Sequence, residues 1–289
     1  MTPSWRQLRD EAVARLAAAG VDDPTQELRW IAERASGRTP AEQVAALDHP
    51  ATAREATVVD HLVRRRETGE PLQYVLGRWG FRTLDLLVDR RVLIPRPETE
   101  VVAGLAIEAA AAIEQPALVV DLGTGSGAIA LSVAAERWPH VEVWATDASA
   151  EALAVARANL AGLGRRSSVV RLVEGDWYGA LPDELEGRVD VVVSNPPYVA
   201  ATEPLPPEVA EWEPTSALRA GPDGLDELRR IISDAPRWLA AGGVLVTEIG
   251  ETQGAAVIDL ATSAGLVDAT IAPDLAGRDR ALVARLPEG

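Results

Sequence analysis

The sequence predicts an α/β fold for most of the chain: a parallel sheet with helices on both faces, preceded by a small all-α domain and a hairpin. Two observations support this prediction. From about residue 100 onward, continuously apolar segments alternate with helical segments, the pattern of parallel strands buried on both faces. Before about residue 75, the apolar residues recur instead at the spacing of amphipathic helices.

We expect residues 1–75 to form a bundle of short helices. Asp23-Pro24 and Thr39-Pro40 each combine a capping side chain with a proline at the first helical position, so each marks the start of a helix. The apolar residues of the first helix share one face, and they are Trp5, Leu8, Ala12, Val13 and Leu16. No residue pattern in this domain is typical of a catalytic site.

Residues 76–95 differ in character and predict a β-hairpin that links two domains. Their apolar residues suggest extended structure, and the prolines at 95 and 97 then form a rigid turn before a helix that starts near Glu98. The third domain follows. The expected boundaries are therefore 1–75, 76–95 and 96–289.

In the third domain we expect seven strands with helices between them. The apolar segments predicted as strands are 117–121, 141–146, 169–173, 189–193, 243–249, 266–271 and 281–284. Predicted helices include 128–135, 150–160 and 226–240. Because open parallel sheets bind ligands beyond the carboxyl ends of their strands, the residues that follow each strand are the candidate site.

The charge and composition of the chain exclude several classes of protein. The chain has 28 basic and 44 acidic residues, and this net charge of −16 argues against nucleic acid as the main partner. No apolar run approaches the ~20 residues of a membrane span, and no signal peptide is visible, so we expect no membrane partner. The absence of cysteine excludes a thiolate metal site and fits the cytoplasm, where we expect a monomer without bound metal.

A glycine-rich turn follows the first strand of the third domain. Its glycines allow a sharp turn and the close approach of a ligand. Their spacing differs from that of the dinucleotide fingerprint, and no Lys-Ser/Thr pair follows, as it would in a nucleoside triphosphate loop. We expect a cofactor to contact this turn, through Asp121, Gly123, Thr124, Gly125, Ser126 and Gly127.

Acidic residues also follow the next two strands. Asp147, 20 residues after Gly127, can accept two hydrogen bonds from ribose hydroxyls, although it or Ser149 could instead cap the next helix. Asp176 could accept the exocyclic amine of an adenine while Trp177 packs on the purine, although a plain surface turn is an alternative. Together these turns fit an adenosine compound without a phosphate chain, and S-adenosyl-L-methionine is the natural candidate.

The fourth strand ends in Asn195-Pro196-Pro197-Tyr198. The side-chain carbonyl of Asn195 and the main-chain carbonyl of Pro196 can each accept one N–H of a planar amide or exocyclic amine, and so hold the poorly nucleophilic nitrogen toward a methyl donor. The prolines hold these carbonyls in place. Tyr198 offers a flat face to the planar group. Asparagine occurs in the chain only at positions 159 and 195, which makes Asn195 more informative than in an average sequence.

These motifs resemble the class I S-adenosylmethionine-dependent methyltransferases that act on planar nitrogen. The Asn-Pro-Pro-Tyr tetrapeptide also occurs in DNA adenine-N6 methyltransferases, so it does not choose the substrate. Several other stretches look like the HemK/PrmC family of protein-(glutamine-N5) methyltransferases. They are Pro71-Leu-Gln-Tyr-Val-Leu-Gly77, Val92-Leu-Ile-Pro-Arg-Pro-Glu-Thr-Glu100, Glu213-Pro…Ala217-Leu, Asp223-Gly-Leu-Asp226 and Asp274-Leu-Ala-Gly-Arg-Asp-Arg280.

The resemblance implies a Rossmann-like domain with a seven-stranded, mostly parallel sheet, and a helical N-terminal domain that helps to hold the partner. The implied substrate is the glutamine of the Gly-Gly-Gln loop in class I peptide chain release factors. The products would be N5-methylglutamine and S-adenosyl-L-homocysteine. The implied pocket for the glutamine comprises Asn195, Pro196, Pro197 and Tyr198, and the resemblance also implies that Asn195 contacts the cofactor. Three alternatives stay open: an adenine-N6 methyltransferase of DNA or RNA, a glutamine methyltransferase of a ribosomal protein, and a non-catalytic binding module.

Overall fold

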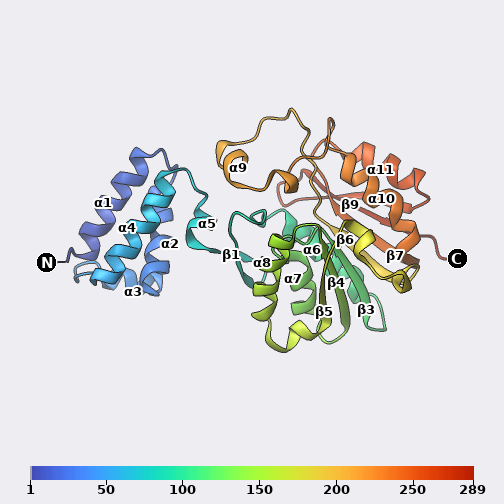
Figure 1. Ribbon diagram of the computed structural model, residues 1–289, viewed down its shortest axis with the longest axis horizontal. Helices are drawn as coiled ribbons and strands as arrows, with labels where there is room; N and C mark the ends of the chain where they lie inside the picture. The colour runs from blue at the N-terminus through green and yellow to red at the C-terminus, as the bar shows by residue number, and fades with distance from the viewer. Residues whose placement is uncertain (1) are drawn as a thin grey trace. The chain divides into compact units, whose positions relative to one another are not determined.

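The computed structural model describes residues 2–289, which form two compact units (Figure 1). The smaller unit comprises the chain up to Arg78 together with Leu205–Trp212. The larger unit comprises Trp79–Pro204 and Glu213–Gly289. None of the helices described in residues 2–289 could span a membrane.

The smaller unit is helical, as the sequence predicts. Its helices are α1 (Trp5–Ala18), α2 (Pro24–Ser36), α3 (Pro40–Ala45), α4 (Ala53–Glu67), α5 (Leu72–Leu76) and α9 (Pro207–Trp212). The side chains of Asp23 and Thr39 cap α2 and α3, and the prolines that follow them occupy the first helical positions. The buried core includes Leu16, Leu28, Ile31 and Val63.

The short helix α9 belongs to this unit although it lies more than a hundred residues further along the chain. Arg66 on α4 is buried, and its guanidinium is 2.7 Å from a carboxylate oxygen of Glu27 and 2.7 Å from one of Glu208 on α9. A buried guanidinium needs such partners, since an unpaired buried charge is strongly destabilising. The sequence gives no local sign of this pairing.

The larger unit begins with a hairpin and contains a seven-stranded sheet. The hairpin strands are β1 (Arg78–Phe81) and β2 (Leu84–Leu87). The sheet has the order β5-β4-β3-β6-β7-β9-β8, in which β9 runs antiparallel to both β7 and β8 and the other pairs are parallel. Its strands are β3 (Ala117–Leu122), β4 (Val141–Asp147), β5 (Val170–Glu174), β6 (Val189–Ser194), β7 (Leu239–Glu248), β8 (Val267–Pro273) and β9 (Asp279–Arg285).

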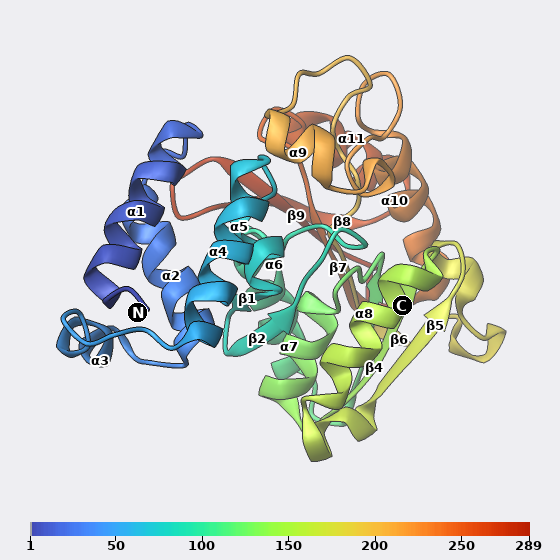
Figure 2. The same ribbon diagram turned by 60° about the vertical axis from the view of Figure 1, so that its left-hand side comes forward.

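Helices cover both faces of this sheet (Figure 2). Residues of α6 (Thr99–Ala111), α7 (Ala128–Arg137) and α8 (Ala150–Ala161) pack into the core on one face. Residues of α10 (Asp226–Trp238) and α11 (Gly254–Ser263) pack into the core on the other. Short 3-10 segments lie at Gly164–Val169, Trp177–Ala180, Asp183–Leu185 and Thr215–Ala217. The predicted fold class is therefore confirmed.

Asn159, the second asparagine of the chain, is a buried connector in the larger unit. Its Nδ2 donates to the carbonyl oxygens of Leu87 and Ser126, at 3.1 and 2.9 Å. Its Oδ1 accepts from the backbone N–H of Leu87 at 2.7 Å. One side chain on α8 thereby joins the end of the hairpin to the glycine-rich turn, and satisfies backbone groups that would otherwise lack a partner.

We predict that Asn159→Ala lowers the free energy of unfolding by about 2–4 kcal/mol, because it leaves a buried N–H and two carbonyl groups without their partner. Urea denaturation followed by circular dichroism would measure the change. Arg157→Ala is the matched control, since Arg157 is exposed on the same helix and its loss should cost at most about 0.5 kcal/mol. Equal midpoints for the two variants would contradict the connecting role of Asn159.

Candidate active site

A cavity of about 530 Å³ lies at the carboxyl edge of the sheet, within the larger unit. This volume is within the range of cofactor and substrate pockets. The turns after β3, β4, β5 and β6 contribute to its wall. The predicted site residues that line it are Gly123, Thr124, Gly125, Ser126, Asp147, Asp176, Trp177, Asn195 and Pro197. Four other predicted residues do not line the cavity: Asp121, Gly127, Pro196 and Tyr198.

The glycine-rich turn is folded tightly against the end of β4. The N–H groups of Gly123 and Thr124 donate to the carbonyl oxygen of Thr146, at 2.9 and 2.8 Å. Gly123 has a φ of +72°, and a Cβ there would lie 2.8 Å from the indole ring of Trp177. Glycine is therefore required at this position by both the backbone conformation and the close approach of the ring.

Asp121 lies beneath the turn and is 1% exposed. Its Oδ2 accepts hydrogen bonds from the hydroxyl of Thr124 at 2.6 Å and from the N–H of Ala130 at 3.0 Å. Burial, with a smaller contribution from the charge of Asp147, raises the pKa of Asp121 to about 6. Its Oδ1 is buried and has no partner among residues 2–289. This carboxylate holds the turn in shape and adds negative potential beneath it.

Asp147 sits at the end of β4 and faces the cavity. Its Oδ2 accepts from the N–H of Gly125 at 2.8 Å, and its Oδ1 accepts from the N–H of Ser149 at 2.8 Å. Burial raises its pKa. The cap of α8 is Ser149, whose hydroxyl accepts from the N–H of Ala152. Asp147 therefore does not cap this helix, and each of its oxygens keeps a lone pair for a ligand.

Asp176 and Trp177 form the turn after β5. Asp176 is exposed and forms an ion pair with Arg230 on α10. The indole N–H of Trp177 donates to Glu227 at 2.7 Å, also on α10. Together with the contact on Gly123, this bond fixes the ring at the cavity wall. The packing of Trp177 on a purine stays a prediction.

Asn195 follows β6, and its side chain is held through the nitrogen of its amide. Its Nδ2 donates to the hydroxyl of Thr99, the first residue of α6, at 3.1 Å. Among residues 2–289 its Oδ1 accepts no hydrogen bond, so this oxygen is available to a ligand. Pro197 lines the cavity, and Pro196 is buried.

Tyr198 is fixed through its hydroxyl, which donates to Glu248 at 3.2 Å. Glu248, at the end of β7, also accepts from the hydroxyl of Thr99 at 2.7 Å. Burial raises the pKa of Glu248 to about 7, against the hydrogen bond from Thr99 and the charge of Arg280, which lower it. Sequence analysis missed Thr99 and Glu248. Two signals were available: Thr99 lies in the run Val92–Glu100 that resembles the HemK/PrmC family, and Glu248 is an acidic residue inside the apolar segment 243–249.

A second buried carboxylate, which sequence analysis also left without a role, joins two segments of the cavity wall. Glu213 accepts from the N–H of Ile94 at 3.1 Å and from the guanidinium of Arg96 at 2.5 Å. Pro95 and Pro214, which flank these contacts, both line the cavity. The Glu213 interactions therefore hold the proline-rich run before α6 against the segment that follows α9.

Comparisons with known proteins bear on this site. Residues 7–77 match the PrmC N-terminal domain, and residues 107–208 match the methyltransferase small domain. A release factor glutamine methyltransferase from Cereibacter sphaeroides is 45% identical over 281 residues, which cover 96% of each chain. This chain belongs to the release factor glutamine methyltransferase family. The family member from Streptomyces coelicolor is 43% identical over 95% of each chain.

The fold of this family member is similar to that of solved structures. The hMettl16 catalytic domain, solved in complex with an MAT2A 3′UTR hairpin, matches with a TM-score of 0.55 and 19% identity. The match covers 77% of this chain and 80% of that one. At this identity the similarity concerns the fold alone.

We predict that Glu213→Ala loosens the cavity wall and lowers the free energy of unfolding by about 3 kcal/mol, because it removes the acceptor of a buried N–H and of a guanidinium. Hydrogen exchange read by mass spectrometry should show faster exchange at 92–97 and 214–218. Glu211→Ala, an exposed acidic residue two positions earlier, is the control and should leave both segments unchanged. Unaltered exchange in Glu213→Ala would refute the clamping role.

Proposed function

We propose that this chain transfers a methyl group from S-adenosyl-L-methionine to the side-chain amide nitrogen of a glutamine in class I peptide chain release factors. The target glutamine is that of the Gly-Gly-Gln motif, and the products are N5-methylglutamine and S-adenosyl-L-homocysteine. The observation that carries the proposal is the Asn195 amide. Its nitrogen is tied to Thr99, while its oxygen is free to accept an N–H at the cavity edge.

The residues of the cavity fit the proposed cofactor. Two carboxylates with raised pKa values, Asp147 at the cavity and Asp121 beneath the glycine-rich turn, favour a cationic ligand, because a positive charge offsets the cost of desolvating negative ones. A Cβ atom added to Gly125 would have no neighbouring atom within 4 Å, so the turn leaves open space for a ligand at this position. Asp147 is suited to hold ribose hydroxyls and Trp177 to pack on the adenine. When bound, S-adenosyl-L-methionine supplies an electrophilic methyl group on a sulfonium.

The role of Asn195-Pro196 follows from the chemistry of the substrate. The lone pair of an amide nitrogen is delocalised, so the nitrogen is a weak nucleophile. Asn195 Oδ1 and the Pro196 carbonyl would accept its two N–H groups and hold the nitrogen in the orientation for attack. The new N–C bond would form as the C–S bond of the sulfonium breaks, with the electron pair left on the sulfur of S-adenosyl-L-homocysteine. Asn195 and Pro196 would stabilise the positive charge that develops on the nitrogen until one N–H proton passes to solvent. Tyr198 and Pro197 would flank the planar amide.

We also propose a division of roles along the chain. Residues 1–75 would bind the release factor, residues 76–95 would link the domains, and residues 96–289 would carry out the transfer. The match of residues 7–77 to the PrmC N-terminal domain supports the first assignment. We propose a monomer that works in the cytoplasm without nucleic acid or membrane as its partner, which is consistent with the net charge of −16.

A methyl-transfer assay with labelled S-adenosyl-L-methionine tests the proposed function. The substrates are a purified bacterial class I release factor, its Gln→Ala variant in the Gly-Gly-Gln loop, a ribosomal protein fraction and duplex DNA. Label on the intact release factor alone is the expected outcome. Label on DNA alone would establish an adenine-N6 methyltransferase instead. Label on a ribosomal protein alone would indicate a glutamine methyltransferase whose substrate is that ribosomal protein. Cofactor binding without any transfer would indicate a binding module.

Asn195→Ala and Asp147→Ala should have contrasting effects. We expect Asn195→Ala to lower kcat by ~10²-fold or more and to change cofactor affinity less, because its carbonyl acts on the reacting amide. We expect Asp147→Ala to raise the Kd for S-adenosyl-L-methionine by roughly tenfold to a hundredfold, from the loss of hydrogen bonds to a charged acceptor. Calorimetry and steady-state kinetics would measure both. Asp259→Ala, an exposed acidic residue on α11, is the control. Equal losses of affinity in the two variants would contradict the assigned roles.

A further inference from the structure

Three side chains from distant parts of the larger unit form a continuous chain of hydrogen bonds that starts at the cavity wall, where Asn195 and Thr99 lie. The amide nitrogen of Asn195 donates to the hydroxyl oxygen of Thr99 at 3.1 Å. The hydroxyl of Thr99 donates to Oε2 of Glu248 at 2.7 Å. Thr99 lies at the start of α6 and Glu248 at the end of β7, so two rigid elements hold the nitrogen side of the amide.

The direction of these hydrogen bonds follows from the chemistry of the groups. An ionised carboxylate accepts hydrogen bonds and cannot donate them, so the single hydroxyl proton of Thr99 must point at Glu248. The Thr99 oxygen can then only accept, and the half of the Asn195 amide that faces it must be the NH₂ group. The charge on Glu248 thus sets the orientation of the amide and leaves Oδ1 for the substrate side.

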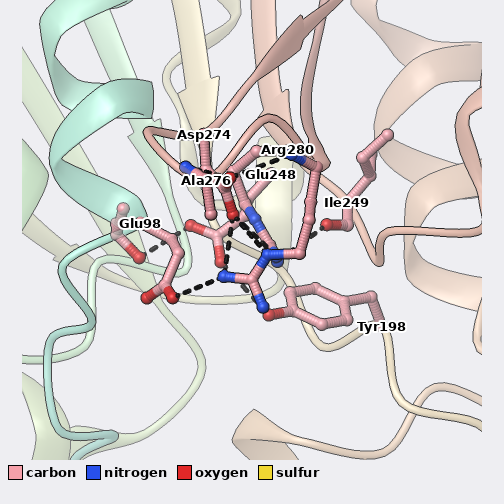
Figure 3. Close-up of polar contacts among 9 residues, drawn as sticks. Glu98, Tyr198, Glu248, Ile249, Asp274, Ala276 and Arg280 are labelled. Carbon is pink, nitrogen blue, oxygen red and sulfur yellow. Dashed lines mark hydrogen bonds and ion pairs between the residues drawn. The ribbon is translucent and has the colours of Figure 1, made fainter.

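The other oxygen of the same carboxylate holds Tyr198. The hydroxyl of Tyr198 donates to Oε1 of Glu248 at 3.2 Å, as Figure 3 shows. Burial raises the pKa of Tyr198, which keeps this hydroxyl protonated as a donor. One buried carboxylate therefore fixes both ends of the Asn195–Tyr198 segment.

We propose that Thr99 and Glu248 are positioning residues that hold the Asn195 amide with its oxygen toward the substrate, and that Glu248 also fixes the Tyr198 ring. The inference rests on the proposed function, because it assigns the free oxygen to the substrate amide. Neither residue touches the substrate in this account. Both act through Asn195 and Tyr198.

The surroundings of Glu248 argue against a role limited to charge pairing. The nearby cation is Arg280, whose guanidinium lies 3.5 Å from Asp274 and 3.3 Å from the carbonyl oxygen of Ile249. Both oxygens of Glu248 are bound instead by the neutral hydroxyls of Thr99 and Tyr198. A carboxylate kept for stability alone would gain more from direct contact with the guanidinium.

The charge on Glu248 changes near neutral pH. The groups that face it are Tyr198 and the charged residues Arg280 and Glu98. Arg280 lowers and Glu98 raises its pKa, and burial, the largest effect, brings the pKa to about 7. Below this pH Glu248 carries a proton and can itself donate to Thr99, so the amide orientation is no longer fixed. Turnover should therefore fall as the pH is lowered through about 7.

Thr99→Val and Thr99→Ser form a matched pair that tests the proposal by kinetics. Valine keeps the shape of threonine without the hydroxyl, whereas serine keeps the hydroxyl. We expect Thr99→Val to lower kcat about tenfold with KM for the release factor and the Kd of S-adenosyl-L-methionine within about twofold, and Thr99→Ser to restore kcat. Equal kcat values in Thr99→Val and wild type, or failure of Thr99→Ser to restore kcat, would overturn the proposal.

Glu248→Gln is the second variant, and it applies even where Thr99→Val does not fold. Glutamine fills the same space but does not titrate. We expect the wild-type kcat to fall on the acid side of about pH 7 and this limb to be absent in Glu248→Gln. An identical acid limb in both proteins would assign the titration to another group and overturn the role of Glu248.

Nuclear magnetic resonance separates this inference from the proposed function, because it needs no turnover. The chain has only two asparagines, so labelling with side-chain ¹⁵N asparagine gives two NH₂ signals, with Asn159 as the internal control. We expect the Asn195 signal to titrate near pH 7 in the wild type and to shift in Thr99→Val, while the Asn159 signal stays in place. A wild type that fails to methylate release factors but shows this titration would refute the proposed function and leave the hydrogen-bond chain intact. An Asn195 signal that is insensitive to both pH and Thr99→Val would overturn the inference.

Discussion

The parallel register of β3 with its two neighbours determines where the polar residues of the cavity lie. Asp121 on β3 is level with Ala145 on β4 and Val193 on β6. The next level adds a direct link, because the hydroxyl of Ser194 donates to the carbonyl oxygen of Leu122 at 2.7 Å. Since all three strands point the same way, the turns that follow them meet at one edge. The glycine-rich turn, the carboxylate at the end of β4 and the amide after β6 are therefore neighbours.

Two buried carboxylates, Asp121 and Glu248, and the half-buried Asp147 lie at this edge of a protein whose net charge is already −16. Burying a carboxylate is costly unless hydrogen bonds or cations compensate. Within residues 2–289, Asp147 accepts from backbone N–H groups and Asp121 from one N–H and one hydroxyl, no cation pairs with either, and both have raised pKa values. Glu248 has Arg280 nearby and still has a raised pKa. The first two carboxylates therefore favour a cationic ligand, whereas both oxygens of the third accept from the hydroxyls of Thr99 and Tyr198 and orient these neighbours.

Sequence patterns predicted the parts of this structure that depend on local chemistry. The strands, the helix caps at Asp23 and Thr39 and the glycine-rich turn each follow from spacing and residue type. The connecting residues depend instead on contacts that are distant in sequence: Glu248 meets Thr99 across 149 residues, and Glu213 meets Ile94 across 119. The rarity of asparagine drew attention to Asn195 but gave no role to Asn159, whose partners are the backbone groups of another segment. Only the folded chain reveals such partners.

The hydrogen-bond chain also explains why position 195 requires an amide. The group there donates to the Thr99 hydroxyl on one side and, in the proposed function, accepts an N–H of the substrate on the other. An aspartate would offer acceptors on both sides and would place a second negative charge close to Glu248, which burial already makes hard to ionise. A serine could supply one donor and one acceptor but could not span the distance between the two with a planar group. Asparagine is the short side chain that carries a donor and an acceptor on opposite sides of a rigid plane, and a sequence that otherwise almost lacks asparagine keeps it here.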